Sequence, residues 1–237
     1  MEAAHPSLAP ARDSDTGPLR CCGCVLVPGA LHEVAARSES ASAAASGFVL
    51  ALAAWAAGPR ATLWIAEEMA LAENGALYGP GLESFGLQPE HLIRVAVAHE
   101  REALWAMEEA LRCRGVGAVI GEIRGTDRGI GLTASRRLAL AAGHDGATAF
   151  LLRASPSDAP VAAATRWIVG AAPSAAKAHG PGPPRLAVHL TRNRRGSQGS
   201  WVLEWNSVEQ RFDLAAADRQ PVAEADGDRP HRTAASV

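Results

Sequence analysis

Short apolar runs alternate with longer alanine-rich segments along the first two thirds of the chain. The short runs suit buried strands, and the longer segments carry apolar residues at the three- and four-residue spacing of a helix. Strands are predicted at residues 30–35, 62–66, 92–96, 118–123 and 148–153. Helices are predicted at residues 43–57, 67–74, 82–85, 100–113 and 134–142. Because helical crossovers favour parallel pairing, this pattern predicts an α/β fold with a mostly parallel sheet flanked by helices.

Glycine, proline and threonine mark the ends of two predicted helices. Gly58 and Pro59 follow the helix at 43–57, where they would stop it. Thr133 would cap the start of the helix at 134–142, and Gly143 would end it.

The pattern changes in the last third of the chain, where helices are no longer predicted between strands. The β-type segments there are residues 165–171, 185–190 and 200–205. The last two are joined by a loop at 191–199, which is typical of an antiparallel hairpin. The Gly- and Pro-rich stretch 173–184 is predicted to be a flexible connector. We therefore expect a C-terminal antiparallel hairpin beside the parallel strands.

Composition indicates one folded domain with irregular ends. The chain has 237 residues, of which 48% are apolar and 20% charged. The expected division is a flexible N-terminal segment at 1–22, a domain at 23–212 and a disordered C-terminal tail at 213–237. No apolar stretch reaches the roughly 20 residues that cross a bilayer. Because residues 1–19 also lack the apolar stretch of a secretory signal, a cytoplasmic protein is expected.

Charge and cysteine content narrow the chemistry. The formal net charge is −2, so a contact with nucleic acid would have to be local. The four cysteines, Cys21, Cys22, Cys24 and Cys113, are too few and too clustered for a disulfide framework. Thiolates bind Zn²⁺ well, but no fourth ligand lies near the first three, so no metal site is expected.

The order of elements resembles the RecA-like recombinase core, and several segments resemble the ImuA family more closely. These segments are 28–34 (PGALHEV), 77–82 (LYGPGL), 104–111 (LWAMEEAL), 132–138 (LTASRRL) and 164–167 (ATRW). The resemblance extends over about residues 28–205. It implies a RecA-like domain and a role beside an error-prone polymerase cassette.

The segment that would form the phosphate loop departs from the recombinase pattern. Residues 37–47 read RSESASAAASG, with no lysine, no glycine before Gly47, and an acidic Glu39 where positive charge is needed. A P-loop holds phosphates with glycine-rich backbone and a lysine, and the only lysine of this chain is Lys177. We therefore expect no catalytic residues, no cofactor and no ordinary ATP hydrolysis. The alternative is a cryptic ATPase that uses Arg37 in place of the lysine.

The resemblance also assigns three vestigial positions of the nucleotide site. Glu68 matches the recombinase's water-activating glutamate, and Glu122 stands where a metal-linked aspartate belongs. Arg153 stands where recombinases carry a sensing glutamine. Without a bound γ-phosphate, a general base has nothing to activate. We expect the three side chains to form a salt-bridged cluster at the carboxyl ends of the strands.

The predicted hairpin is rich in arginine. Arg192, Arg194 and Arg195 resemble the segment through which recombinases reach a neighbour's nucleotide, and Arg185 and His189 lie nearby in sequence. These arginines are candidate contacts for DNA phosphates or for an acidic partner, which guanidinium groups suit. The alternative is a solvated hairpin tip.

Tryptophans supply a second set of candidates. Trp201 and Trp205 share one face of the closing strand, where they would stack on bases or pack in the core. The remaining tryptophans are predicted to be core or interface anchors: Trp55, Trp64, Trp105 and Trp167.

The resemblance implies a non-catalytic accessory protein of damage-inducible (SOS) translesion DNA synthesis. Its expected partners are an ImuB-like Y-family polymerase relative and an error-prone replicative-type polymerase subunit, with a RecA filament or DNA as further candidates. A cell-division inhibitor resembling SulA is the alternative of a different class, because that type also keeps a RecA-like core without a phosphate loop. Co-purified partners would separate the two.

Overall fold

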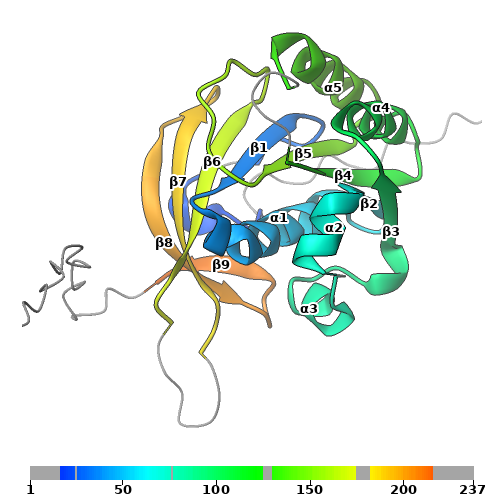
Figure 1. Cartoon of the computed structure of the whole chain (residues 1–237). Helices are drawn as coiled ribbons and strands as arrows, with labels where there is room; N and C mark the ends of the chain where they lie inside the picture. Colours follow the sequence, from blue (N-terminus) through cyan, green and yellow to red (C-terminus); the bar gives the residue numbers. More distant parts are fainter. Residues whose placement is uncertain (1–16, 25, 76, 125–129, 175–181, 216–237) are drawn as a thin grey trace, which may run out of the picture.

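The computed structural model describes residues 17–24, 26–75, 77–124, 130–174 and 182–215 (Figure 1). The strands are β1 (Leu31–Ala36), β2 (Ala61–Glu67), β3 (Leu92–Val97), β4 (Val116–Ile123), β5 (Thr148–Arg153), β6 (Thr165–Ala172), β7 (Arg185–Asn193), β8 (Gly199–Asn206) and β9 (Arg211–Leu214). The helices are α1 (Ser42–Ala57), α2 (Glu68–Asn74), α3 (Gly79–Ser84), α4 (Glu100–Leu111) and α5 (Leu132–Asp145).

All nine strands belong to one sheet, in the order β3-β2-β4-β5-β1-β6-β7-β8-β9. The pairs from β3 to β6 are parallel, and the pairs from β6 to β9 are antiparallel. The predicted mostly parallel sheet and its C-terminal antiparallel part are therefore confirmed. The carboxyl ends of the parallel strands lie along one edge of the sheet, where open α/β folds place their binding sites.

Helix α1 is apolar on every side because the sheet curls around it. Most of its residues are buried, and Phe48 packs on Trp167 of β6 and on Phe212 of β9, with ring centroids 5.4 and 5.5 Å away. The stretch Glu39–Ala57 is long and apolar enough to cross a membrane by length and composition alone. Most of this stretch is buried in the core, which explains its apolar composition.

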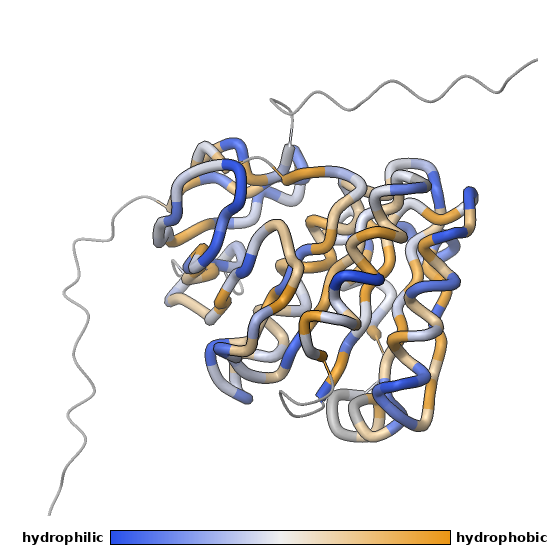
Figure 2. The backbone as a smooth tube through the Cα atoms, turned by 90° about the horizontal axis from the view of Figure 1, so that it is seen from above, coloured by the Kyte–Doolittle hydropathy of each residue, from blue (hydrophilic) through white to orange (hydrophobic). Residues whose placement is uncertain are grey.

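Helices α4 and α5 cover the opposite face of the sheet (Figure 1). Their inner faces bring Met107, Leu111 and Leu138 onto Ile65, Val119 and Leu151 of the strands. Figure 2 shows hydrophobic residues along the interior and hydrophilic residues along the outer turns of these helices. The strands thus separate two cores, one around α1 and one under α4 and α5.

The ends of α5 differ from the sequence prediction. The helix begins at Leu132 after Gly131, so Thr133 lies inside it and makes no capping bond. Gly143 also lies inside the helix, which ends at Gly146, a residue with a φ of 73°. That left-handed conformation suits glycine, and the Gly146 N–H closes the helix on the Ala142 carbonyl. Of Gly143 and Gly146, the second ends the helix.

Residues near both predicted domain boundaries contact the rest of the described structure. At the start, Leu19 is buried, and the Phe212 N–H of β9 donates to the Pro18 carbonyl at 3.0 Å. At the end, β9 continues to Leu214, although 213–237 was predicted to be a disordered tail. The N-terminal segment and β9 thus stabilise each other, and neither segment's sequence alone indicates this contact.

Candidate functional site

The resemblance implies a nucleotide position where β1, β4 and β5 end and α1 begins. The cavity at this position in the structure has a volume of about 10 Å³, which is about the space of one water molecule. Pockets for small molecules usually enclose about 300–1,000 Å³. The residues around the cavity are Ala36, Ser42, Ala45, Ser46, Glu122, Arg124, Leu152, Arg153 and Ala154. The side chains of the described residues thus leave little open space at this position.

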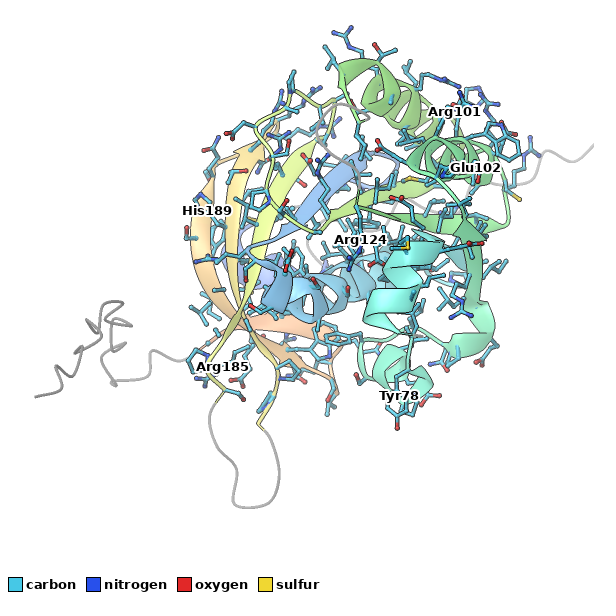
Figure 3. All side chains as sticks on the ribbon, in the orientation of Figure 1. Tyr78, Arg101, Glu102, Arg124, Arg185 and His189 are labelled. Carbon is cyan, nitrogen blue, oxygen red and sulfur yellow. The ribbon has the colours of Figure 1, made fainter. Side chains whose placement is uncertain are left out.

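Glu122 is held by a tryptophan of the neighbouring strand. The indole Nε1 of Trp64 donates to a carboxylate oxygen of Glu122 at 3.1 Å. Arg124, two residues further on (labelled in Figure 3), lines the same cavity as Glu122. Its backbone N–H donates to the Glu67 carboxylate at 3.0 Å. These hydrogen bonds link the carboxyl ends of β2 and β4.

Residues 37–47, at the position expected for a phosphate loop, begin with a backbone hydrogen bond to the sheet. The Arg37 N–H donates to the Val169 carbonyl of β6 at 2.7 Å. The Arg37 side chain lies against β6, where its Nε is 3.2 Å from the position a Cβ would take on Gly170. A 3-10 turn (Glu39–Ala41) then leads into α1, and the Ser42 hydroxyl donates to the Glu39 carbonyl at 2.7 Å. Arg37 does not line the cavity, so this geometry gives no support to its use as a lysine substitute.

Gly47 serves packing in this structure. A Cβ on Gly47 would lie 2.7 Å from Cζ of Phe85, and Phe85 in turn packs on Trp205 with ring centroids 5.4 Å apart. The glycine of the expected phosphate-loop region therefore lets the chain after α3 approach α1.

The expected cluster of Glu68, Glu122 and Arg153 is only partly assembled. Glu122 and Arg153 share the small cavity, but Glu68 is exposed at the start of α2. The carboxylate that reaches β4 is that of Glu67, the last residue of β2. The resemblance assigned Glu68, whereas the structure brings its neighbour Glu67 to β4. Strand alternation would have indicated Glu67, since it shares a face with Leu63 and Ile65.

Arg153 pairs with a buried acid that the sequence analysis did not single out. Glu33 lies in the middle of β1, 1% exposed. Its two carboxylate oxygens face Arg153 Nε at 3.8 Å and Arg166 Nε at 2.5 Å. A charged residue inside the apolar run of a central strand was the available signal, because such a group is buried only with partners.

Arg166 also fixes the loop that follows β5. Its two terminal nitrogens donate to the carbonyls of Ser157 at 3.0 Å and Ala159 at 2.6 Å. Glu100, at the start of α4, is influenced by the same network: burial raises its pKa, the Glu67 carboxylate raises it further, and Arg153 lowers it. The edge of the sheet is thus occupied by ion pairs within the chain.

Of the four hairpin arginines, two bond within the chain and two are exposed. The Arg185 side chain is nearly buried and pairs with Glu204 at 2.6 Å, and Arg192 donates to the Val161 carbonyl at 3.1 Å. Arg194 and Arg195 are exposed in the turn between β7 and β8. Figure 3 shows Arg185 and His189 along β7, far from Arg101 and Glu102 on α4. Only the turn arginines are therefore presented fully to solvent.

The two tryptophans of β8 pack inward. Trp205 is buried and donates from Nε1 to the Ser84 carbonyl at 2.7 Å. Trp201 is half-buried, with its ring centroid 6.4 Å from that of Trp167. These positions favour core packing over base stacking. Of the other predicted anchors, Trp64 and Trp167 are buried, Trp55 is half-buried and Trp105 is 64% exposed.

The cysteines of the N-terminal cluster bond locally. The Cys22 thiol donates to the Leu19 carbonyl at 3.1 Å, and the Cys24 thiol to the Cys22 carbonyl at 3.6 Å. Within the described residues, no three His, Cys, Asp or Glu side chains converge as metal ligands would. Lys177 falls outside those residues.

A search against protein-family models finds no match. The chain is 32% identical over 192 residues to Protein ImuA of Caulobacter vibrioides, in each of two strains. That similarity covers 74% of this chain and 75% of the relative. The chain belongs to the ImuA family.

The fold of this ImuA family member is RecA-like. The crystal structure of the RadB recombinase matches it with a TM-score of 0.57 and 14% sequence identity, over 84% of this chain and 96% of that one. Within that fold, the described residues where β1, β4 and β5 end and α1 begins surround a cavity of about 10 Å³.

Proposed function

We propose that the chain is a non-catalytic accessory protein of damage-inducible translesion DNA synthesis. The observation that carries this proposal is the 10 Å³ cavity at the nucleotide position of a RecA-like sheet. Family membership supports the accessory role. Localisation in the cytoplasm belongs to the same proposal.

The physical reason is that phosphoryl transfer depends on positioned positive charge. A P-loop enzyme stabilises the transferred group with backbone N–H groups, a lysine and Mg²⁺. Here the corresponding backbone bonds to β6, Arg37 lies against Gly170, and Glu122 accepts the Trp64 indole N–H. A chain of this kind would act by holding other molecules together.

The partners we propose are those of the polymerase cassette. The chain would bridge an ImuB-like Y-family polymerase relative and an error-prone replicative-type polymerase subunit, with a RecA filament or DNA as a further contact. Arg194 and Arg195 are the exposed hairpin groups that suit an acidic surface or a phosphate. Arg185 and Arg192 already bond within the chain, so we propose only supporting roles for them.

Titration of the full chain with ATP and Mg²⁺ tests the non-catalytic part. We expect no saturable heat and no release of inorganic phosphate. Micromolar affinity, together with phosphate release that is lost in Glu67→Gln or Glu68→Gln, would overturn this part of the proposal.

Affinity purification after DNA damage tests the accessory part. We expect the polymerase subunits to co-purify, and to be depleted in the double variant Arg194→Glu with Arg195→Glu. The double variant Arg20→Glu with Arg94→Glu is the charge-matched control, because both of these arginines are also exposed. Recovery of a tubulin-like division protein would support the SulA-like alternative and reject ours.

A further inference from the structure

Helices α4 and α5 present large apolar side chains to solvent. Trp105 is 64% exposed and Leu140 is 75% exposed. Neither contributes to the core under these helices, which is formed by inner-face residues such as Met107 and Leu138. Exposed apolar side chains gathered on one face commonly mark an interaction surface. Tryptophan is also among the residues that contribute most to binding at protein interfaces.

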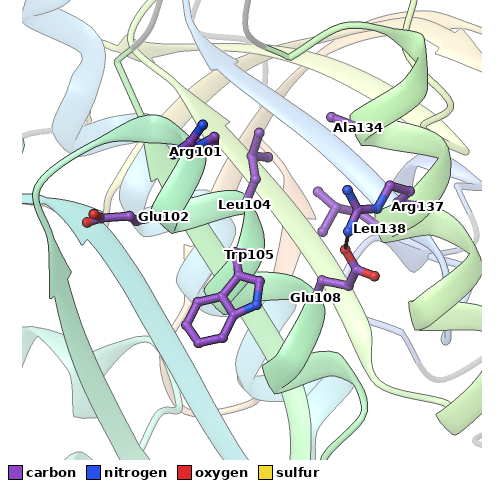
Figure 4. A pocket seen from close by; sticks show the side chains of 8 residues that line it. All are labelled: Arg101, Glu102, Leu104, Trp105, Glu108, Ala134, Arg137 and Leu138. Carbon is purple, nitrogen blue, oxygen red and sulfur yellow. Dashed lines mark hydrogen bonds and ion pairs between the residues drawn. The ribbon is translucent and has the colours of Figure 1, made fainter.

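A groove runs between the two helices and contains two hollows. The first hollow, of about 510 Å³, is lined by Arg101, Glu102, Leu104, Trp105, Glu108, Ala134, Arg137 and Leu138 (Figure 4). The second, of about 470 Å³, is lined by Glu108, Arg112, Arg137, Leu140, Ala141 and His144. Both volumes fall in the range of binding pockets. Glu108 and Arg137 border both hollows.

A network of ion pairs fixes the middle of the groove. Glu108 accepts hydrogen bonds from Arg112 at 2.7 Å and from Arg137 at 2.5 Å, and so ties α4 to α5. The two arginine side chains remain 55% and 64% exposed. Their guanidinium groups are therefore held in place before any partner arrives, which lowers the entropy lost on binding.

The arginines on this face keep hydrogen-bond donors for a partner. Each of the three carboxylates is already engaged within the chain: Glu108 as above, Glu109 with Arg112 at 2.9 Å, and Glu102 with the Ala98 N–H at 3.0 Å. Arg101 makes no ion pair with any described residue, and Arg112 and Arg137 retain further N–H groups. The groove thus offers spare donors beside an apolar surface, which is complementary to carboxylates beside apolar side chains.

We propose that the α4–α5 groove docks an amphipathic helix of a partner protein, with Asp or Glu residues flanking its apolar face. A helix is the fitting shape because α4 has 12 residues and α5 has 14, so the groove runs for about 18–21 Å at 1.5 Å per residue. Apolar side chains one and two turns apart would enter the two hollows, and the carboxylates would meet Arg101 and Arg137. The inference concerns a surface separate from the hairpin and the filled cavity, and it does not rest on the proposed function.

The test is selection of binders from a phage-displayed library of helical peptides on the immobilised full chain. We expect enriched peptides with apolar residues at the i, i+3 or i+4, and i+7 spacing, flanked by Asp and Glu. The most enriched sequence, as a labelled synthetic peptide, would then be titrated with the chain in fluorescence anisotropy. We expect the double variant Trp105→Ala with Leu140→Ala to weaken its binding by about tenfold or more. Arg101→Glu should weaken it as well.

Val208→Ala is the matched control, because Val208 is 91% exposed in the turn between β8 and β9. It should leave the affinity unchanged, and circular dichroism should show all variants folded. Three results would overturn the inference: no enriched peptide, basic or non-helical peptides, and binding insensitive to Trp105 and Leu140. A dimer in light scattering that dissociates on Trp105→Ala would also overturn it, because a second copy would then occupy the groove.

Discussion

The indole N–H of Trp64 on β2 points at the carboxylate of Glu122 on β4, 3.1 Å away. In the recombinase pattern the residue at the end of this strand is linked to the metal of the bound nucleotide. Here the acid bonds to a buried tryptophan of its own chain. This pair gives Glu122 a structural role between β2 and β4.

Replacing Trp64 with phenylalanine tests that role. The substitution removes the donor to a charged acceptor and part of a buried ring, so we expect a loss of about 1–3 kcal/mol in the free energy of unfolding. Urea denaturation measures it. Trp105→Phe is the control, because Trp105 is exposed, and it should change stability by less than about 0.5 kcal/mol. Equal effects of the two substitutions would contradict the role assigned to the Trp64–Glu122 bond.

Glu33 is expected to be the carboxylate on which folding depends most. It faces Arg153 and Arg166 within the core, so Glu33→Gln removes the buried carboxylate that both guanidinium groups face. Breaking a buried ion pair from one side costs about 3–5 kcal/mol, which a thermal melt would show. Glu209→Gln removes an exposed partner of Arg211 and should cost no more than about 1 kcal/mol. A Glu33→Gln variant as stable as the control would show that the three charges are not coupled.

Hydrophobic pattern was enough to predict most of the sheet. Thr148–Arg153 is the strand predicted, and the predicted antiparallel hairpin appears as β7 and β8. These elements were readable because their apolar residues face a core on one or both sides. The short strand β9 was not predicted, since Phe212 is its one buried residue and only the whole fold shows what Phe212 meets.

The candidate site was harder to predict because its residues depend on contacts between distant segments. Arg192 resembled a free hairpin arginine, but the loop after β5 brings the Val161 carbonyl to it. Glu67 and Glu68 are adjacent in sequence, and a one-residue shift in the end of β2 decided which one reaches β4. Trp105 was assigned to core or interface by its residue type, and its exposure follows from the rotation of α4 on the sheet.

Two nearby glycines should respond in opposite ways to alanine. A Cβ on Gly117 of β4 would lie 2.5 Å from the Ala57 Cα at the end of α1, a backbone atom that cannot move alone. Gly117→Ala is therefore expected to cost about 1–3 kcal/mol in unfolding free energy. A Cβ on Gly115 would meet nothing within 4 Å, so Gly115→Ala should be neutral or stabilise by up to about 1 kcal/mol. Similar losses in both variants, measured by urea denaturation, would contradict the close packing of α1 on β4.

His32 is expected to make stability depend on pH. The ring is fully buried between β1 and its neighbours, with Nε2 donating to the Val27 carbonyl at 2.9 Å and Nδ1 2.7 Å from the Thr165 hydroxyl. The Trp167 indole N–H donates to the same hydroxyl oxygen at 2.9 Å, which leaves the hydroxyl proton for Nδ1. The ring is therefore neutral in the folded chain, and burial lowers its pKa from 6.5 to about 4.

Because the folded pKa of His32 is below the unfolded one, the unfolded chain binds this proton first as the pH falls. Stability from His32 is complete above about pH 6.5 and is lost progressively towards pH 4. Between pH 7 and pH 5 the loss should be about 2 kcal/mol, because the slope of about 1.4 kcal/mol per pH unit applies only below about pH 6.5. Urea denaturation at the two pH values, in wild type and His32→Gln, isolates this contribution even where the variant is less stable at both. An equal loss in wild type and variant would mean that the folded chain binds the His32 proton as readily as the unfolded chain.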